Sequence, residues 1–301
     1  MQTGNSPAAT EKRRLTPERR KARRRKKRIR VIVLWTVFYL AAAVLIFCVV
    51  DMVFIAMQRK AAREQYAAMQ AMYEVQAAAE DAGDEQAEPE PVEPIDPSKW
   101  YAPYAAPADK RIDFAALQAR NPEVCGWIYV EGTTIDFPVL RSSISDSFYL
   151  THDIDGRASE HGAICIDPRC EADFSDRVTM VYGHNMLDGS MFAPLYNYYK
   201  DAAFFEAGHK VILYLDNAML TYRVVAAYEY GHEQPLYYYN LLKDEEFMRY
   251  CATFLENRDM KARILDGLTI TPEDHLLTLI TSTNARADQR LFVQAVLIHE
   301  P

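Results

Sequence analysis

Three side chains in the second half of the chain have the chemistry that acyl transfer needs. His184 follows the apolar run VTMVY and the flexible Gly183, Ser282 follows the apolar run LLTLIT, and Arg290 opens the apolar run RLFVQAVLI. An imidazole can act as general acid and base, a hydroxyl as nucleophile, and a cation as the stabiliser of a developing oxyanion. A hairpin between the last two runs would bring Ser282 and Arg290 together, so we expect the three groups to converge on one site.

Eight short β-rich runs must position these residues. Each run is rich in β-branched and aromatic residues and is bounded by turn formers, which predicts strands. Eight strands within about 190 residues indicate a mainly β domain, either a barrel or a sandwich. The runs are GWIYV, TIDFPVL, GAICID, VTMVYG, KVILYLDN, MLTYRVVAAYEY, LLTLIT and RLFVQAVLIHE.

Two helices are expected beside the strands. The segment DFAALQARNPEV predicts a short helix at the start of the domain, with Phe114, Leu117 and Val124 as the candidates to face inward. The segment DEEFMRYCATFLENR places its apolar residues on one helical face, which predicts an amphipathic helix over residues 244–258 packed on the sheet. The inward-facing residues of that helix would be Phe247, Tyr250 or Cys251, Phe254 and Leu255.

Residues 31–50 form an uncharged apolar stretch of the length that a membrane helix needs. About 20 residues, rising 1.5 Å each, cross a hydrocarbon core of about 30 Å. A buried core helix would not be apolar on every side, and the apolar part of a cleaved signal peptide would be shorter and followed by a small-residue cleavage site. We therefore expect a single transmembrane helix over residues 31–57.

Charge is distributed unevenly on the two sides of this stretch. The first 30 residues hold 13 Lys or Arg and 2 Glu, whereas the whole chain carries a net charge of −8. By the positive-inside rule this asymmetry predicts a cytoplasmic N-terminus and an external C-terminus. Because the basic run adjoins the apolar stretch, contact with anionic lipid headgroups explains it more simply than binding to nucleic acid.

The sequence between the membrane and the β-rich runs has two parts. Residues 58–86 are rich in Ala, Gln, Met and Glu, which predicts a helical stalk, and the acidic, Pro-rich segment EPEPVEPIDPSKWYAPYAAP predicts an extended spacer. We therefore expect four parts along the chain. They are a basic cytoplasmic tail (1–30), a transmembrane helix (31–57), an extracytoplasmic stalk with its linker (58–108) and the β domain (109–301).

The five cysteines match neither a zinc site nor a dense disulfide framework. Cys165 and Cys170 could pair if a loop brought them close, and most of the cysteines are interpreted as buried small hydrophobic residues. No His spacing indicates a metal site. Asp153 and Asp155 in HDIDG lack the other ligands of a calcium loop and are expected to form a turn. No metal or organic cofactor is therefore expected.

Two aromatic segments, NYYKDAAFF and QPLYYYNLL, could line a groove that binds a peptide. Aromatic residues at this density usually pack in the core and on the surface of a sheet. Packing is therefore the favoured interpretation for both segments.

Several blocks of the sequence, in order, resemble class B sortases. They are NPEVCGWIYVEGTTIDFPVL, DSFYLTHDIDGRASEHGAICID, VYGHNMLDGSMFAPLYNY, and TLITS followed eight residues later by Arg. Together the blocks span most of residues 118–300. The resemblance implies a sortase-type eight-stranded β-barrel, with an N-terminal helix and a long amphipathic helix before the late strands, anchored in the membrane of a Gram-positive bacterium.

The resemblance also implies roles for the site residues. In sortases a Cys attacks a peptide bond of a sorting signal, and the acyl group then passes to an amine. Carried over by position, His184 is the acid and base, Arg290 the oxyanion cation and Thr281 a neighbouring substrate-binding residue, while Ser282 occupies the position of the nucleophilic Cys. A hydroxyl needs an aligned base, and no residue of the sequence is identified that would hold the tautomer of His184.

Three interpretations follow from Ser282. The chain is a membrane-anchored transpeptidase with a Ser nucleophile, a pseudo-sortase that binds sorting-signal peptides or a partner without turnover, or a Cys enzyme in which Ser was introduced deliberately. The expected partners are surface proteins that carry sorting signals, a peptidoglycan precursor or pilin amine as acceptor, and the membrane, with no nucleic acid. The expected location is the cell membrane, crossed once, with the catalytic domain outside.

Overall fold

The computed structural model describes residues 17–73, 95–231, 233–283 and 288–298. Contacts within the chain divide it into two units, Met1–Lys60 and Ala61–Pro301. Residues 74–94, which hold the end of the predicted stalk and only the start of the predicted Pro-rich spacer, lie outside the described residues.

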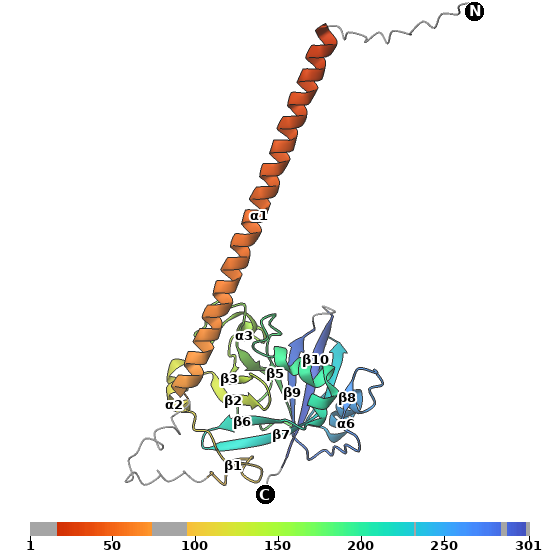
Figure 1. The fold of residues 1–301 in the computed structure, drawn as a ribbon. Helices are drawn as coiled ribbons and strands as arrows, with labels where there is room; N and C mark the ends of the chain where they lie inside the picture. Colours follow the sequence, from red (N-terminus) through yellow and green to blue (C-terminus); the bar gives the residue numbers. More distant parts are fainter. Residues whose placement is uncertain (1–16, 74–94, 232, 284–287, 299–301) are drawn as a thin grey trace, which may run out of the picture. The chain divides into compact units, whose positions relative to one another are not determined.

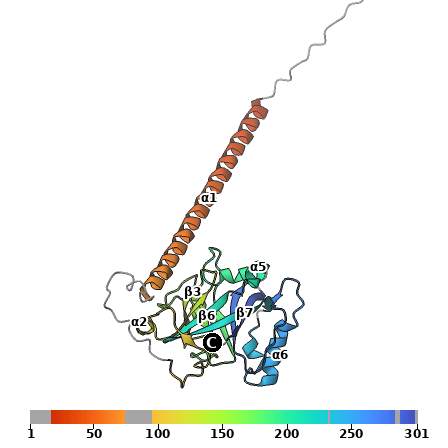
Figure 2. The ribbon, with the colours of Figure 1, turned by 60° about the horizontal axis from the view of Figure 1, so that its bottom comes forward.

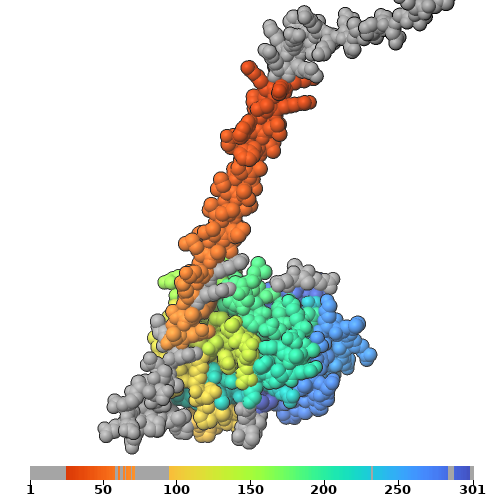
Figure 3. All heavy atoms as spheres, in the orientation of Figure 1, coloured from red at the N-terminus to blue at the C-terminus, as the bar shows by residue number. Residues whose placement is uncertain are grey.

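One long helix, α1 (Pro17–Tyr73), contains the apolar stretch (Figure 1). Within it, Arg25–Met57 is long and apolar enough to cross a membrane, and the apolar window is not buried by any described part of the chain. Leu34, Phe47 and Phe54 are among its exposed side chains. Figure 3 shows this segment in red to orange. A helix that is apolar on every side needs an apolar surrounding, and this composition suits a membrane anchor or a signal sequence.

Eight strands close into a barrel, which confirms the predicted mainly β fold. Neighbouring strands pair in the order β7, β10, β9, β5, β4, β3, β2, β6, and β6 pairs with β7 to complete the ring. The pairs β3–β4 and β5–β9 are parallel, and the other pairs in the ring are antiparallel. The strands are β2 (Val124–Val130), β3 (Asp136–Arg141), β4 (Ile164–Ile166), β5 (Val178–Tyr182), β6 (Lys210–Leu215), β7 (Ala218–Gly231), β9 (Leu276–Ser282) and β10 (Gln289–Leu297).

The structure also contains shorter strands and helices besides the eight barrel strands. Two strands of two residues each, β1 (Ala106–Pro107) and β8 (Arg263–Ile264), pair with β7 beside the ring. The predicted first helix is α2 (Phe114–Arg120), in which Phe114 and Leu117 are buried as expected. The other elements are α3 (Phe148–Thr151), η2 (Ala193–Leu195), α4 (Tyr196–Lys200), α5 (Ala202–Glu206), η3 (Pro235–Tyr237) and α6 (Asp244–Leu255).

The amphipathic helix α6 lies along the outside of the barrel (Figure 2). Its buried residues are Phe247, Tyr250, Cys251 and Phe254, as the periodicity predicts. They share a hydrophobic cluster with side chains from one face of β5, β9 and β10. The helix ends at Leu255 rather than at residue 258, and Leu255 is only partly buried.

Alternation along β9 sends neighbouring side chains to opposite faces of the sheet. Leu277 and Leu279 enter the core cluster of the barrel, whereas Leu276 and Ile280 enter the cluster under α6. By the same alternation, Ser282 lies on the face of Ile280, and Thr281 lies on the opposite face with Leu279.

Four buried polar side chains fasten α6 to the outer face of the sheet. The amide of Gln294 donates to the hydroxyls of Tyr250 at 2.7 Å and Tyr228 at 3.0 Å. Its carbonyl oxygen accepts from Thr278 Oγ1 at 2.7 Å, and Thr278 Oγ1 also lies 3.2 Å from the Tyr250 hydroxyl. These bonds satisfy the polar groups of an otherwise apolar interface, as burial requires.

Residues before position 109 also pack on the barrel. Tyr66 of α1 is buried, and its ring lies edge-on to Phe137 with the centroids 5.3 Å apart. Tyr101 is buried in the same core cluster. Contacts therefore extend the barrel unit back to Ala61, and the four-part division of the chain stays a prediction.

Replacement of Gln294 by Leu should destabilise the barrel by about 2 kcal/mol, because buried hydroxyls of Tyr228, Tyr250 and Thr278 lose a partner. The measurement is thermal unfolding of the full chain in nanodiscs, followed by near-UV circular dichroism. Gln118→Leu is the matched control, since Gln118 is exposed and makes one bond of 3.2 Å to the carbonyl of Val124. Equal unfolding temperatures for the two variants would contradict the role of the Gln294 contacts.

Candidate active site

The hydrogen-bond register of three neighbouring strands brings the predicted site residues to one row. In the antiparallel pair of β9 and β10, Ser282 lies directly opposite Arg290. In the parallel pair of β5 and β9, Tyr182 lies opposite Ile280, and the amide of Gly183 donates to the carbonyl of Ile280 at 3.1 Å. Continuing that register by two residues places His184 level with Ser282.

The side chains of Ser282 and Arg290 lie on the face of the sheet that carries α6. Directly paired residues of neighbouring strands share a face, and residues two apart on one strand share it too. Ile280 packs in the cluster under α6, so Ser282 points to the same side. Both Ser282 and Arg290 are half-buried, and one guanidinium nitrogen of Arg290 donates to the carbonyl of Gln289 at 2.9 Å.

A main-chain carbonyl holds His184. Its Nε2 lies 2.5 Å from the carbonyl oxygen of Leu150 in α3. A carbonyl oxygen only accepts, so Nε2 carries the proton in this contact and Nδ1 is the nitrogen left with a lone pair when the ring is neutral. Residue type could not indicate this partner, because any residue at position 150 would supply the same carbonyl.

The loop after His184 is joined to β9 by Asn185, a residue that no motif or spacing in the sequence had indicated as part of the site. Asn185 Nδ2 donates to the carbonyl of Ser282 at 3.0 Å. The loop closes on itself through a bridge between Asn185 and Met191, and the amide of Phe192 donates to the carbonyl of His184 at 2.9 Å. The side chain of the residue next to His184 is therefore bonded to the main chain of Ser282.

Gly183 has a different role from the flexibility expected of it. Its φ angle is not positive, so flexibility of the main chain is not what the position requires. A Cβ atom there would lie 2.5 Å from Ile164 Cδ1 and 2.6 Å from the ring of Phe192. The absence of a side chain lets β5 end in close contact with its neighbours just before His184.

Thr281 lies on the other face of β9. Its side chain is 2 % exposed and points into the barrel, opposite to Ser282. Its role in substrate binding stays a prediction.

The four cysteines of the barrel unit are free thiols. Burial raises the pKa of Cys165, Cys170 and Cys251 to about 12, and it also raises the pKa of Cys125 above the usual value. A thiol with such a pKa is protonated at neutral pH and is a poor nucleophile. None of the four is therefore suited to replace Ser282 as the attacking group.

The two aromatic segments differ in their environment. In the first segment Tyr198, Tyr199 and Phe205 are buried, in agreement with packing. In the second segment Tyr237 and Tyr238 are exposed and line a groove of about 1190 Å³. This groove also contacts Val178, at the opposite end of β5 from His184.

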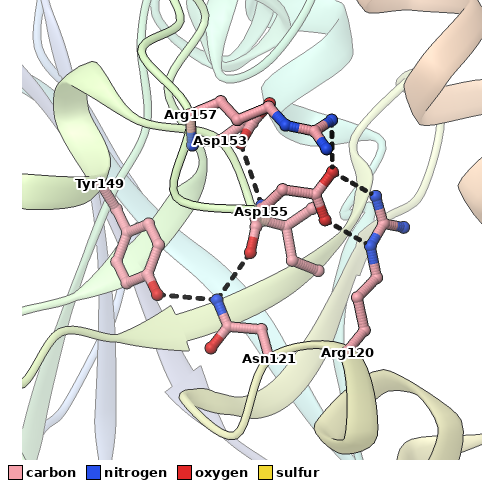
Figure 4. Close-up of polar contacts among 7 residues, drawn as sticks. Arg120, Asn121, Tyr149, Asp153, Asp155 and Arg157 are labelled. Atoms are coloured by element: carbon pink, nitrogen blue, oxygen red, sulfur yellow. Dashed lines mark hydrogen bonds and ion pairs between the residues drawn. The ribbon is translucent and has the colours of Figure 1, made fainter.

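The turn expected at HDIDG packs against α2 (Figure 4). Asp153 accepts from the amides of Asp155 and Arg157, and Asp155 forms an ion pair with Arg120 at 2.6 Å. Asn121, which ends α2, donates to the hydroxyl of Tyr149 at 2.8 Å and to the carbonyl of Ile154 at 2.7 Å. These contacts hold the segment that follows α3, and thus the carbonyl of Leu150.

Comparisons with known proteins agree with this architecture. No family model matches the chain. Sortase B of Listeria monocytogenes is 30% identical over 193 residues, which cover 62% of this chain and 75% of that protein. The crystal structure of sortase B from Clostridium perfringens is 31% identical, with a TM-score of 0.52, and covers 61% of this chain and 98% of that one.

A third similarity covers more of the chain. The crystal structure of sortase B from Bacillus anthracis is 26% identical, with a TM-score of 0.60, and the match covers 81% of this chain and 100% of that one. The barrel, its strand order and these similarities agree with one another. The chain therefore belongs to the sortase B family of sortase-type transpeptidases.

Proposed function

We propose that the chain is a membrane-anchored transpeptidase that cleaves a C-terminal sorting signal and joins the acyl group to an amine of the cell wall or of a pilin. The observation that supports the proposal most directly is the pairing of Ser282 with Arg290, together with the pairing of β5 with β9 that ends two residues before His184. Surface proteins with sorting signals are the proposed substrates.

The proposed reaction begins with attack by residue 282 on the scissile carbonyl. His184 Nδ1 accepts the proton of the nucleophile while Nε2–H remains bonded to Leu150. Arg290 stabilises the negative oxygen of the tetrahedral intermediate, and the protonated His184 then gives its proton to the leaving amine. The acceptor amine then attacks the acyl-enzyme and loses a proton to His184. His184 passes this proton to the departing atom of residue 282, which regenerates the free enzyme as the product leaves.

Ser282 at the proposed nucleophile position sets the efficiency of this reaction. A hydroxyl requires an aligned general base, whereas a thiol is already ionised to a few per cent at neutral pH. The Leu150 carbonyl supports the Ser enzyme, because it holds the neutral ring in the tautomer with a basic Nδ1. The alternative is a catalytically impaired pseudo-sortase, natural or engineered, that keeps the peptide-binding surface without turnover.

The proposed orientation places the basic tail in the cytoplasm and the barrel outside the cell. The support is the apolar Arg25–Met57 segment with its excess of Lys and Arg on the N-terminal side. The acceptor amine, in a peptidoglycan precursor or a pilin, would then lie on the same side as the site.

Both the chain as written and Ser282→Cys should cleave labelled sorting-signal peptides, with the Cys form about 10-fold faster or more because of its intrinsic nucleophilicity. His184→Ala should abolish cleavage in both, as measured by release of the labelled C-terminal fragment. His209→Ala, whose ring packs against Phe204 beside β6, is the matched control and should retain activity. Cleavage by the Cys form alone would favour the pseudo-sortase, and no peptide binding by either form would refute both functions.

Alkylation should distinguish position 282 from the native cysteines. With a pKa of about 12, Cys165, Cys170 and Cys251 are ionised to about one part in 10⁴ or less at pH 7.5, and this fraction rises only as the pH approaches 12. Iodoacetamide at pH 7.5 should therefore modify Ser282→Cys within minutes and leave the three native thiols intact, as read by peptide mapping. Modification of a native thiol at a comparable rate would contradict their assignment as inert.

Single-cysteine labelling should establish the orientation. In intact Gram-positive cells a membrane-impermeant maleimide should react with Asp266→Cys, which is exposed on the barrel, and should reach Ser6→Cys only after permeabilisation. The opposite pattern would reverse the proposed topology.

A further inference from the structure

The carbonyl that holds His184 belongs to a short run of main-chain acceptors in and beside α3. The carbonyl of Tyr149 accepts from the amide of Ala163 at 2.7 Å, and the carbonyl of Thr151 accepts from the amide of Ser159 at 2.9 Å. Between them, the carbonyl of Leu150 accepts from His184. The segment containing residues 159–163 therefore lies along α3 and fixes the main chain on both sides of the acceptor.

Gly162 makes the closest contact between this segment and α3. Its φ angle is +58°, and a Cβ atom placed on it would lie 2.4 Å from the carbonyl oxygen of Tyr149 and 3.0 Å from both the carbonyl carbon and oxygen of Leu150. These neighbours are main-chain atoms, which cannot rotate away as a flexible side chain could. Any side chain at 162 must therefore displace the Tyr149–Leu150 main chain.

The other side of Gly162 is held by helix α1. The hydroxyl of Tyr66 donates to the carbonyl of Gly162 at 2.5 Å. Burial raises the pKa of Tyr66 well above its usual value, so this hydroxyl stays protonated and remains a donor over the whole physiological range. Gly162 is thus fixed between Tyr66 and the peptide group that binds His184.

We propose that Gly162 is a positioning residue for the proposed catalytic base: its close packing holds the Leu150 carbonyl where it accepts from His184 Nε2 and so leaves Nδ1 free to take the proton of residue 282. This inference rests on the proposed role of His184. Gly162 itself does not contact the substrate. Tyr66, on α1, holds Gly162 in place through its hydrogen bond to the Gly162 carbonyl.

The expected consequence of Gly162→Ala follows from the geometry. Main-chain atoms at 2.4 Å from a new methyl must move by several tenths of an ångström at least to reach an ordinary contact. The imidazole then loses its fixed acceptor, and part of the neutral population adopts the tautomer with a proton on Nδ1, which cannot act as base. Misplacement of a catalytic group by about 1 Å can cost about 100-fold in rate, so we expect kcat to fall about 10–100-fold with little change in KM.

A matched control separates this effect from ordinary backbone strain. Gly156 also has a positive φ angle, +71°, but a Cβ atom there would meet nothing within 4 Å. Gly156→Ala therefore imposes the same left-handed strain on an L residue without displacing the Leu150 carbonyl. Its kcat should stay within about 3-fold of the parent, given that the turn keeps its Asp153 contacts.

The test uses the full chain with Ser282→Cys in nanodiscs, labelled with ¹⁵N-histidine. One readout is the rate of peptide cleavage. The other is the tautomer of the neutral His184 ring, which two-bond ¹H–¹⁵N spectra report. The parent and Gly156→Ala should show the proton on Nε2, and Gly162→Ala should show a mixture with Nδ1–H together with the fall in kcat. Equal effects of Gly162→Ala and Gly156→Ala on both readouts would overturn the proposal, as would Nδ1–H in the parent.

Tyr66→Phe keeps the test decisive if Gly162→Ala does not fold. It removes the donor to the Gly162 carbonyl without adding volume, and it should shift the tautomer in the same direction with a smaller loss of kcat, about 2–5-fold. No shift of tautomer in Tyr66→Phe would then overturn the proposal. A parent with Nε2–H that never cleaves peptide would refute the proposed function and leave the positioning of His184 supported.

Discussion

The register that β5, β9 and β10 share is the constraint on which the site depends. The antiparallel pairing of β9 with β10 places Ser282 opposite Arg290, and the parallel pairing of β5 with β9 brings the end of β5, two residues before His184, beside Ile280. A slip of one residue along β9 would turn Ser282 into the barrel and bring Thr281 to the outer face. Because such a slip would also turn Thr278 away from Gln294 and move Leu277 and Leu279 out of the barrel core, the side-chain pattern of β9 stabilises the register.

The interface with α6 strengthens this constraint. Gln294 and Thr278 lie on the same face of the sheet as the site, and their bonds to Tyr228 and Tyr250 can form in one register only. The apolar cluster around them excludes water, so a shifted arrangement would leave several buried polar groups without partners. The same helix that closes the outer face therefore fixes the strands that carry Ser282 and Arg290.

The second layer of the site is made largely by the main chain. The carbonyl oxygen of Leu150 accepts from His184, and that of Ser282 accepts from Asn185. Gly183 and Gly162 have no Cβ atom, which allows the neighbouring segments to pack closely. Main-chain groups in a packed barrel have few alternative positions, so they orient an imidazole without an acidic third residue. The network around Asn121 and Tyr149 extends this support to α2 (Figure 4).

The sequence predicted the elements well where periodicity is strong, and the site only where residue type reveals it. The eight runs correspond to the eight barrel strands, and the hairpin between two of them correctly paired Ser282 with Arg290. The contact of His184 with the Leu150 carbonyl could not be predicted, since every residue type has the same main-chain carbonyl. Tyr66 was missed because one aromatic residue in an Ala- and Gln-rich helix carries no pattern that indicates a tertiary contact.

Cross-linking of paired cysteines tests the convergence of the site most directly. In the full chain, His184→Cys combined with Ser282→Cys should form a disulfide under mild oxidation, because residues level on neighbouring strands have their Cα atoms within the distance that a disulfide spans. His184→Cys combined with Thr281→Cys should not, since Thr281 points into the barrel. Efficient cross-linking through 281 and none through 282 would contradict the register and, with it, the proposed active site.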